Sequence, residues 1–541
     1  MASRISIKAT LRLRGDEAPR SPNNARYNEP MMLTLGEQMA RVGRHYGRRT
    51  AVVSSQGNVD WSDFSSRVSV AAGVLHGLGL TPGARIAIYS RNSERFDELK
   101  WGAFHAGVVA VPINWRLAPP EIAHILQDSN CETIFVENDF IEVFDNDDLK
   151  PWRDKLVSLT ASPDNNLDSY DQLFDRAGDT DVATVLPDDD ALILYTGGTT
   201  GRSKGVRLSH ANIISCASAF TLATRGQPDD TYLHLAPMFH SADLLGTGWV
   251  LMGAAHAYLP QFSPASFLDA INENQVTMTV AVPTMLMMTL TDPAIDTADT
   301  RSLRMMGFGA SPMDPAWIRR TAEGFPHTQL FNCYGLTETS PDLTVFDPAE
   351  FQRAIEEDSP LLASVGKPNC LVDLKVVNPQ GDALPSGETG VLLARGPNIT
   401  KGYLNLPEQT AEALQDGWLR TGDIARIDED GYVYLVDREK DLIITGGENV
   451  YSSEVETALY QHPDIHECAV IGTHDDQLGQ LVTAVIIVKP EKTLVAEAII
   501  EHCRELIGGY KVPRRVEFVD EMPKNELGKI LKNRLRETYA S

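Results

Sequence analysis

The segment Thr196-Gly-Gly-Thr-Thr-Gly-Arg-Ser-Lys-Gly205 lies between two apolar runs that predict strands, Ala191 to Thr196 and Gly205 to Leu208. It predicts a phosphate-binding loop, because glycines let a backbone approach a ligand closely, hydroxyls donate hydrogen bonds and a lysine adds positive charge. The residues that supply these features are Thr196, Gly197, Gly198, Thr199, Thr200, Gly201 and Lys204.

A plain hairpin turn is the alternative interpretation of this segment. Turns need glycine, but they rarely need this many hydroxyls together with a lysine. The segment is also not a Walker A loop, because Lys204 follows Ser203 and not a glycine. We therefore expect an anion cradle of another kind.

The composition describes an acidic globular protein of more than one domain. The chain has 541 residues, 43% of them hydrophobic, and a formal net charge of −26. It is too long for one ordinary core. An acidic surface repels nucleic acid and anionic lipid, so we expect neither nucleic-acid binding nor stable membrane insertion.

The cysteines favour a reducing compartment. The six are scattered along the sequence and form no Cys-x-x-Cys pair. This argues against a disulfide framework and against a zinc site. We expect a cytoplasmic protein.

The order of predicted elements gives an α/β fold class. Apolar runs alternate with an amphipathic helical pattern, which predicts a mixed or parallel sheet with helices on its faces. These elements are strands at 85–89, 107–112 and 133–137 and a helix at 94–105. From about Ser364 the strands become short and are separated by Gly, Pro and Asp, which predicts a β-rich subdomain.

A charged run, Asp437-Arg-Glu-Lys-Asp441, follows and reads as a linker to a small α+β domain. The predicted boundaries are therefore 31–436 for the large domain, 437–441 for the linker and 442–541 for the small domain. Residues 1–30 carry basic residues without a continuous apolar centre. We interpret them as a disordered leader, with a mitochondrial-type presequence as the alternative.

The glycine- and threonine-rich loop closely resembles the signature of the adenylate-forming superfamily, which includes acyl-CoA synthetases, peptide-synthetase adenylation domains and firefly luciferase. That family usually has proline at the position of Ser203 and often serine at that of Gly197. Both departures leave the hydroxyls and the lysine in place. The resemblance extends from Leu33 to Arg536, with every core motif in order.

A second segment, Asn332-Cys-Tyr-Gly-Leu-Thr-Glu338, offers an aromatic face, a hydroxyl and a carboxylate. A carboxylate is a hard oxygen ligand that suits Mg²⁺. By resemblance this is the family's second ATP motif, with Glu338 and Thr200 as metal ligands and Thr337 on a phosphate. The residues that the resemblance assigns to ATP here and in the preceding adenine turn are Asn332, Tyr334, Gly335, Thr337, Gly309, Ala310 and Ser311.

Four later segments complete the resemblance. It implies that Asp423 binds the ribose hydroxyls, that Arg438 contacts the nucleotide and that Lys440 is the hinge. It also implies that the glycine pair Gly446 and Gly447 lines a thiol tunnel for CoA, although a β-turn explains that pair almost as well. Lys529, in Pro523-Lys-Asn-Glu-Leu-Gly-Lys529, is the implied catalytic lysine that neutralises charge at the α-phosphate.

The acid side is predicted around Pro237-Met-Phe-His240, where relatives place an aromatic residue and a histidine beside the acyl carboxylate. His240 is the implied orienting residue. Leucine and methionine dominate 244–252 and 280–290, which favours a fatty, branched or aryl acid. Asp243 interrupts this apolar stretch, and we expect it either to contact a polar substrate group or to face solvent.

The resulting hypothesis is an ATP-dependent acid–CoA ligase that uses Mg²⁺, forms acyl-AMP and then an acyl-CoA. Three alternatives remain: transfer to another acceptor, such as a carrier-protein thiol or an amine; a luciferase-like oxygenase, which shares most of these motifs; and a non-catalytic acyl- or nucleotide-binding regulator. A regulator would tolerate loss of Lys204, Glu338 or Lys529, and all three are present. A homodimer is suggested by relatives alone.

Overall fold

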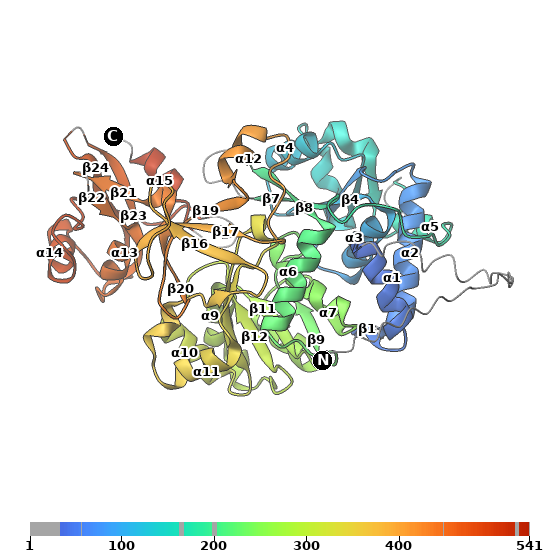
Figure 1. Ribbon diagram of the computed structural model, residues 1–541, viewed down its shortest axis with the longest axis horizontal. Helices are drawn as coiled ribbons and strands as arrows, with labels where there is room; N and C mark the ends of the chain where they lie inside the picture. The colour runs from blue at the N-terminus through green and yellow to red at the C-terminus, as the bar shows by residue number, and fades with distance from the viewer. Residues whose placement is uncertain are drawn as a thin grey trace, which may run out of the picture. The chain divides into compact units, whose positions relative to one another are not determined.

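The computed structural model describes residues 33–55, 57–161, 167–196, 203–446, 448–475, 477–524 and 530–539. Within these ranges the strands form four sheets (Figure 1). The predicted leader, residues 1–30, lies outside the described residues. The sheets and their helices confirm the α/β fold class, with a large N-terminal domain and a smaller C-terminal domain.

The first sheet of the large domain has six strands in the order β6-β5-β3-β4-β7-β8. Its neighbouring strands are parallel except for β7 and β8, which form an antiparallel hairpin. The strands are β3 (Arg85–Tyr89), β4 (Val109–Pro112), β5 (Thr133–Val136), β6 (Leu156–Ser158), β7 (Asp190–Thr196) and β8 (Lys204–Ser209).

The second sheet has nine strands in the order β15-β14-β13-β12-β11-β9-β10-β1-β2. The strands from β13 to β1 in this order are parallel, and antiparallel strands flank them. The strands are β1 (Thr50–Val52), β2 (Val59–Asp60), β9 (Thr231–His234), β10 (Ala255–Tyr258), β11 (Met278–Ala281), β12 (Met305–Phe308), β13 (Gln329–Tyr334), β14 (Thr344–Val345) and β15 (Lys367–Pro368).

The predicted β-rich subdomain is an antiparallel sheet of five strands. They are β16 (Asp373–Val377), β17 (Thr389–Arg395), β18 (Leu414–Gln415), β19 (Trp418–Ile427) and β20 (Val433–Arg438). Strand β20 therefore continues through the first two residues of the predicted linker, and the 3-10 helix η8 (Glu439–Asp441) follows it.

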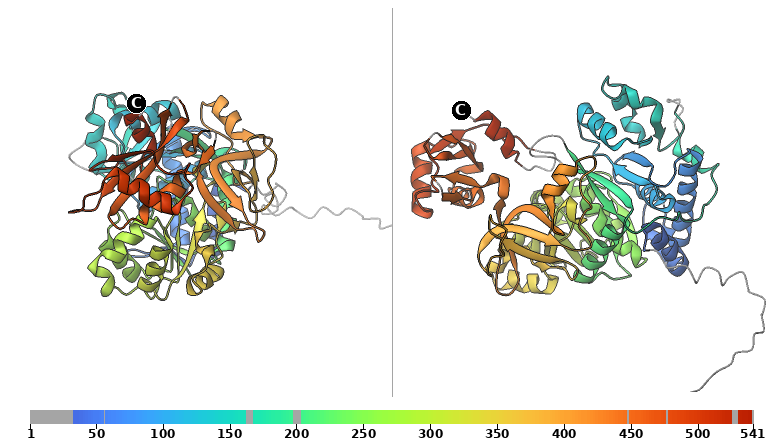
Figure 2. Two further views of the ribbon diagram at one scale, coloured as in Figure 1. Left: turned by 90° about the vertical axis from the view of Figure 1, so that its left-hand side faces the viewer. Right: turned by 45° about the horizontal axis from the view of Figure 1, so that its top comes forward.

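The small domain is a five-stranded sheet covered by helices on both faces; its elements are red in Figure 2. Cys468 and Val470 pack with helices α13 (Ser452–Tyr460) and α14 (Ala496–Leu506), whereas Ala469 and Ile471 pack with α15 (Lys532–Thr538) on the other face. This alternation is the period of two that a strand requires. The strands are β21 (Ile443–Thr445), β22 (Glu448–Val450), β23 (Ile465–Asp475), β24 (Gly479–Val488) and β25 (Arg515–Phe518).

The helices of the large domain lie against its sheets. They are α1 (Leu35–Tyr46), α2 (Trp61–Gly77), α3 (Glu94–Ala106), α4 (Pro119–Ser129), α5 (Tyr170–Phe174), α6 (His210–Ala223), α7 (Thr247–Leu251), α8 (Pro264–Glu273), α9 (Pro283–Thr291), α10 (Pro315–Gly324), α11 (Pro348–Glu356) and α12 (Pro407–Ala413). Among the described residues, none of the helices has the length and apolar character needed to cross a bilayer.

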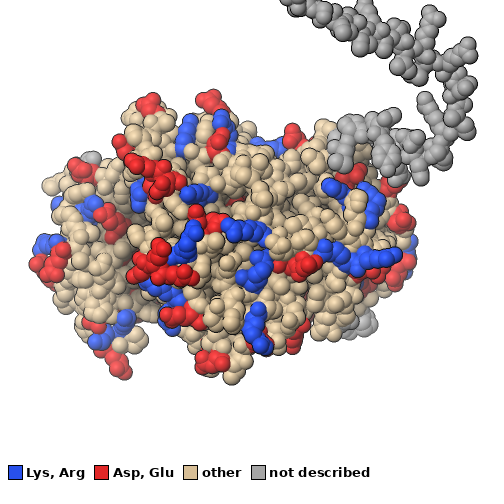
Figure 3. All heavy atoms as spheres, turned by 60° about the horizontal axis from the view of Figure 1, so that its bottom comes forward, with Lys and Arg blue, Asp and Glu red and all other residues tan. Residues whose placement is uncertain are grey.

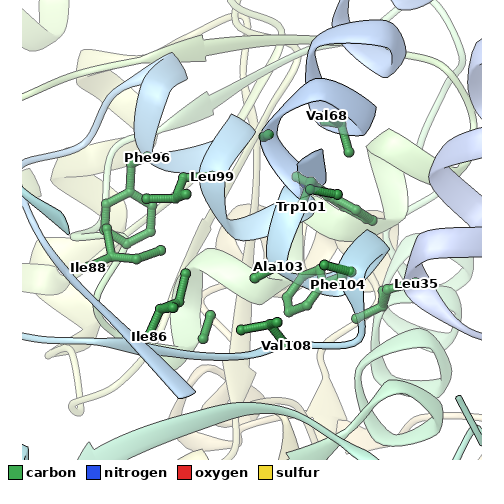
Figure 4. Packing of buried hydrophobic residues seen from close by; sticks show 14 of the residues in the cluster. Leu35, Val68, Ile86, Ile88, Phe96, Leu99, Trp101, Ala103, Phe104 and Val108 are labelled. Carbon is green, nitrogen blue, oxygen red and sulfur yellow. The ribbon is translucent and has the colours of Figure 1, made fainter. Parts of the chain in front are cut away.

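Helix α3 is buried on every side. All residues from Phe96 to Ala106 are buried, and Figure 4 shows Phe96, Leu99, Trp101 and Phe104 directed into the surrounding core. Ser93 caps the helix by accepting a hydrogen bond from the Phe96 amide. A helix buried in this way needs partners for its polar side chains, and α3 carries buried charged residues as well.

The end of α3 explains one difference from the predicted elements. A strand is predicted from Gly107, but β4 begins at Val109. Gly107 has a φ of 68° and terminates the helix in the left-handed conformation, which glycine adopts without steric cost. The predicted strand 85–89 matches β3 residue for residue.

Charges of both signs are mixed on the face shown in Figure 3. Lysine and arginine side chains lie among the aspartates and glutamates on this face, and neither sign forms a separate half. The net charge of −26 therefore does not prevent local positive charge.

We predict that Trp101→Ala lowers the free energy of unfolding by about 3–5 kcal/mol, because it empties a large buried volume that the neighbours cannot fill. Trp101 is only 1% exposed. Chemical denaturation followed by circular dichroism measures the change. Leu222→Ala is the control, since Leu222 on α6 is 69% exposed. Equal losses in both variants would contradict the assignment of the core.

Candidate active site

The exit of the predicted phosphate loop is fixed by the β7–β8 hairpin. Thr196 and Lys204 are cross-strand partners at the open end of this hairpin. The loop residues Gly197, Gly198, Thr199, Thr200 and Gly201 lie outside the described residues, so their roles stay predictions. The structure thus defines where the loop begins and ends.

Tyr403 joins the phosphate-loop lysine to the predicted metal carboxylate. The Lys204 ammonium lies 5.0 Å from the centre of the Tyr403 ring. The Tyr403 hydroxyl donates a hydrogen bond to Glu338 Oε1 at 2.9 Å. Burial and the nearby Glu338 raise the pKa of Tyr403 above its ordinary value, so the hydroxyl keeps the proton that it donates.

The predicted second ATP motif spans the end of β13 and the turn that follows it. Thr337 and Glu338 lie in the 3-10 turn η6 (Thr337–Thr339), and the Glu338 carbonyl accepts a hydrogen bond from the Thr400 amide at 2.8 Å. Asn332 donates a hydrogen bond to the Ser364 carbonyl. Gly335 has no room for a side chain, because a Cβ there would lie 1.7 Å from the Pro341 carbonyl oxygen.

The predicted adenine turn lies directly after β12. A Cβ on Gly309 would lie 2.5 Å from the Cys333 carbonyl oxygen, so glycine allows β12 and β13 to stay close there. Ala310 has a φ of 66°, and Ala310 and Ser311 are exposed. The turn therefore presents its backbone at the surface.

Asp423, the predicted ribose residue, belongs to a hydrogen-bonded group with two other predicted nucleotide residues. Asp423 on β19 and Arg438 on β20 are cross-strand partners, and Arg438 Nη1 lies 2.9 Å from Asp423 Oδ1. The Tyr334 hydroxyl donates to Asp423 Oδ2 at 2.5 Å. Burial and the Asp423 carboxylate raise the pKa of Tyr334 above its ordinary value. Three residues predicted from separate motifs thus converge.

The small-domain residues are only partly described. Lys440 lies in η8, directly after β20, which carries Arg438. Gly446 follows β21 with a φ of 59°, and among the described residues a Cβ there would meet only Leu478, at 3.4 Å. Gly447 and Lys529 lie outside the described residues.

The acid-side turn, defined here as residues 234–246, runs from the end of β9 through the 3-10 helix η4 (Ser241–Gly246). Asn92 holds its first part, donating to the carbonyls of His234 and Ala236 and accepting from the Met238 amide. The Ser241 hydroxyl lies 3.4 Å from that of Thr337, so this turn contacts the ATP motif directly.

His240 is half-buried beside Phe239, with their ring centres 4.6 Å apart. Burial lowers the pKa of His240 to about 4, and the positive charge of Arg116 acts in the same direction. His240 is therefore neutral at physiological pH. A neutral imidazole orients a carboxylate through a hydrogen bond without adding a charge of its own.

One expectation about the acid side is wrong. Asp243 neither faces solvent nor is free to bind substrate, because it is 4% exposed and both carboxylate oxygens have protein partners. These partners are Lys100 and His234. Sequence reasoning missed this pairing because Lys100 lies 143 positions away. The sequence did hold one signal: a lysine between Leu99 and Trp101, in an apolar part of a predicted helix, indicates a buried charge that needs an acidic partner.

The apolar segments of the acid side contribute to the core. Leu245 and Trp249 pack with Val280 and with the aromatic residues Phe220 and Tyr232. Sequence reasoning also missed Ser241 and Tyr403. Ser241 directly follows His240, and the one local signal for Tyr403 is the glycine that precedes it.

Comparisons with known proteins agree with this geometry. The family described as AMP-binding enzyme matches residues 39–404, and the AMP-binding enzyme C-terminal domain matches residues 454–529. The chain belongs to the AMP-binding enzyme family. It is an AMP-forming acid–thiol ligase of the adenylate-forming superfamily, with ATP and CoA as substrates.

Three similar proteins illustrate the relationship. A feruloyl-CoA synthase from Amycolatopsis sp is 34% identical over 93% of this chain and 99% of its own length. The long-chain-fatty-acid–CoA ligase FadD13 of Mycobacterium tuberculosis is 33% identical over 90% of this chain and 94% of its own. The ATP-bound crystal structure of MatB from Rhodopseudomonas palustris has a TM-score of 0.83 at 30% identity, covering 94% of this chain and 99% of MatB.

We predict that the contribution of His240 to this ligase does not titrate near neutrality. Its pKa of about 4 means that protonation begins only well below pH 6. The ratio of kcat/KM for wild type to that for His240→Gln should therefore stay within about twofold from pH 5.5 to 8.5. A tenfold fall in this ratio between about pH 7 and 5.5 would show a histidine with an ordinary pKa.

Proposed function

We propose that this ligase activates a fatty, branched or aryl carboxylic acid as its acyl-AMP and then transfers the acyl group to CoA. The observation that carries the proposal is the 3.4 Å contact between the Ser241 and Thr337 hydroxyls. This contact supports the proposal, because attack of a carboxylate on a phosphate requires the segments that bind the two reactants to lie side by side.

In the first step a carboxylate oxygen attacks the α-phosphorus of ATP, and the bond to the bridging oxygen of the β-phosphate breaks. Pyrophosphate leaves with the electron pair of that bond. Lys204 and the hydroxyls of the phosphate loop stabilise the leaving charge, and Lys529 neutralises the pentacovalent centre. His240 orients the acid.

In the second step the CoA thiolate attacks the carbonyl carbon of the mixed anhydride. The bond from the carbonyl carbon to the phosphate oxygen breaks, and AMP leaves with its electron pair. Rotation about Lys440 would remove Lys529 and admit the thiol past Gly446 and Gly447. Tyr334, Asp423 and Arg438 would hold the adenosine during both steps.

The residues present fit Mg²⁺. Glu338 is half-buried and supplies one carboxylate, and Thr200 would add a hydroxyl. Across the part of the chain that the structure describes, no group of three or more histidine, cysteine, aspartate or glutamate side chains could hold a metal. Mg²⁺ takes one or two protein oxygens and otherwise binds phosphates and water, so one carboxylate and one hydroxyl are a donor set that fits it. When bound, it would neutralise charge on the phosphates.

The substrate class follows from two supports. Relatives are named for feruloyl, indoleacetate and long-chain fatty acids, all of which carry a large apolar part. The segments beside His240 in this chain are rich in leucine and methionine. We place the enzyme in the cytoplasm, in keeping with its six free cysteines.

A carrier-protein thiol is the second candidate acceptor. A fatty acid–acyl-carrier-protein ligase, ScoC of Streptomyces coeruleorubidus, is 32% identical over 95% of this chain. The first step would be the same with this acceptor.

We predict that pyrophosphate release from MgATP depends both on the acid and on CoA. The measurement uses short, medium, long and aryl acids, each with and without CoA. Strong CoA-dependent turnover with one apolar class is the expected result. Release that ignores CoA but rises with a carrier protein would select the second acceptor, and silence with every acid would contradict the proposed function.

A further inference from the structure

A cluster of buried charged and polar side chains joins the acid-side turn to helix α3 and strand β10. Its members come from three places in the fold: helix α3, the acid-side turn and strand β10. They are Asp97, Lys100, His234, Asp243, His256 and Tyr258. Burying charged groups costs free energy unless opposite charges are paired. We therefore ask how these side chains are paired and what the cluster does.

The geometry pairs the charges closely. Lys100 Nζ lies 2.5 Å from Asp243 Oδ2 and 2.8 Å from Asp97 Oδ1. His234 Nδ1 lies 2.6 Å from Asp243 Oδ1, so both oxygens of that carboxylate are engaged. Lys100 is 3% exposed and Asp243 is 4% exposed, which excludes water as their main partner.

The remaining members extend the cluster to β10. His234 Nε2 lies 2.9 Å from His256 Nδ1, and the Tyr258 hydroxyl donates to Asp97 Oδ2 at 2.8 Å. The Tyr258 ring also stacks on His234 with ring centres 4.8 Å apart. The cluster therefore fixes the position of His234, where the acid-side turn begins.

The central pair stays ionised. Burial acts to raise the pKa of Asp243, but Lys100 and His234 outweigh it and hold that pKa at about 2. Burial acts to lower the pKa of Lys100, but Asp243 and Asp97 outweigh it and raise that pKa above its ordinary value. Charged hydrogen bonds in a buried setting are stronger and more directional than neutral ones.

This ion pair connects to the acid-side residues through the backbone. The Asp243 amide donates to the His240 carbonyl at 3.1 Å, and the His240 amide donates to the Pro237 carbonyl at 2.9 Å. Asp243 is therefore one hydrogen bond from His240 and two residues from Ser241. Anchoring Asp243 therefore restrains the backbone that carries both side chains.

We propose that Lys100 and Asp243 are positioning residues, which hold His240 and Ser241 in register with the ATP motif and so set the affinity for the acid. The proposal rests on the proposed function, in which His240 meets the acid. Neither residue touches substrate. The cluster acts through the turn.

Helix α3 also carries a buried carboxylate, Glu98, whose partners lie outside the acid-side turn, and a variant of it is a matched control. Glu98 is fully buried and accepts hydrogen bonds from Arg67, Arg95 and Tyr170. These partners lie on α2, α3 and α5 and not on the acid-side turn. Glu98→Gln therefore disturbs a buried charge cluster of the same helix without loosening His240.

The test compares Asp243→Asn with Glu98→Gln by acid-dependent exchange of ATP with pyrophosphate, using the acid of fastest turnover. Asp243→Asn keeps the size of the side chain and removes its charge. We expect it to raise the KM for the acid about tenfold or more and to leave the KM for ATP within about twofold. Glu98→Gln should leave both within about twofold, and Lys100→Met should follow Asp243→Asn.

Amide hydrogen exchange gives a second readout that needs no substrate. We expect faster exchange in residues 238–246 of Asp243→Asn, with residues 335–345 unchanged and with no such change in Glu98→Gln. Unchanged acid KM and unchanged exchange would overturn the positioning role, as would equal rises in both KM values. Failure of Asp243→Asn to fold, with Glu98→Gln folded, would assign the pair to folding alone. A wild-type enzyme without acid-dependent exchange would instead contradict the proposed function, and hydrogen exchange would still decide the role of the pair.

Discussion

The site depends on the hydrogen bond from Tyr403 to Glu338, because it joins three segments that are distant in the sequence. The Leu404 amide donates to the Gly205 carbonyl at 2.7 Å, and the Arg207 amide donates to the Gly402 carbonyl at 3.1 Å. The segment that carries Tyr403 is thereby fixed to the exit strand of the phosphate loop. Its hydroxyl then reaches Glu338 in η6, the turn that follows β13 of the nine-stranded sheet. The Tyr403 side chain thus lies between the Lys204 ammonium, which contacts its ring, and the Glu338 carboxylate, which accepts from its hydroxyl.

Strand direction explains why the other groups arrive at the same place. Strands β9, β12 and β13 are part of the parallel section of the nine-stranded sheet. Their carboxyl ends therefore meet at one edge, where α/β proteins bind ligands. The acid-side turn, the adenine turn and the second ATP motif each follow one of these strands. The ribose group is added from the antiparallel sheet of β19 and β20.

Much of this could be predicted from the sequence because its signals are local. Strand β3 is a five-residue apolar run between polar segments, and the hairpin around the phosphate loop follows from its flanking strands. The convergence of Tyr334, Asp423 and Arg438 could be predicted only from the resemblance to the family, because their separation in the sequence does not indicate that they lie close together. The pairing of Asp243 with Lys100 could not be predicted, because it depends on how α3 packs against the acid-side turn and β10. The partners of Tyr403 depend in the same way on tertiary packing.

The most direct test of this account is MgATP binding to Tyr403→Phe, measured by isothermal titration calorimetry beside wild type. The variant keeps the ring near Lys204 and removes only the hydroxyl that aligns Glu338. The account predicts that MgATP binds about fivefold or more weakly, whereas AMP, which lacks the β- and γ-phosphates, binds within about twofold of wild type. Equal weakening for both nucleotides, or none for MgATP, would contradict the central role of Tyr403.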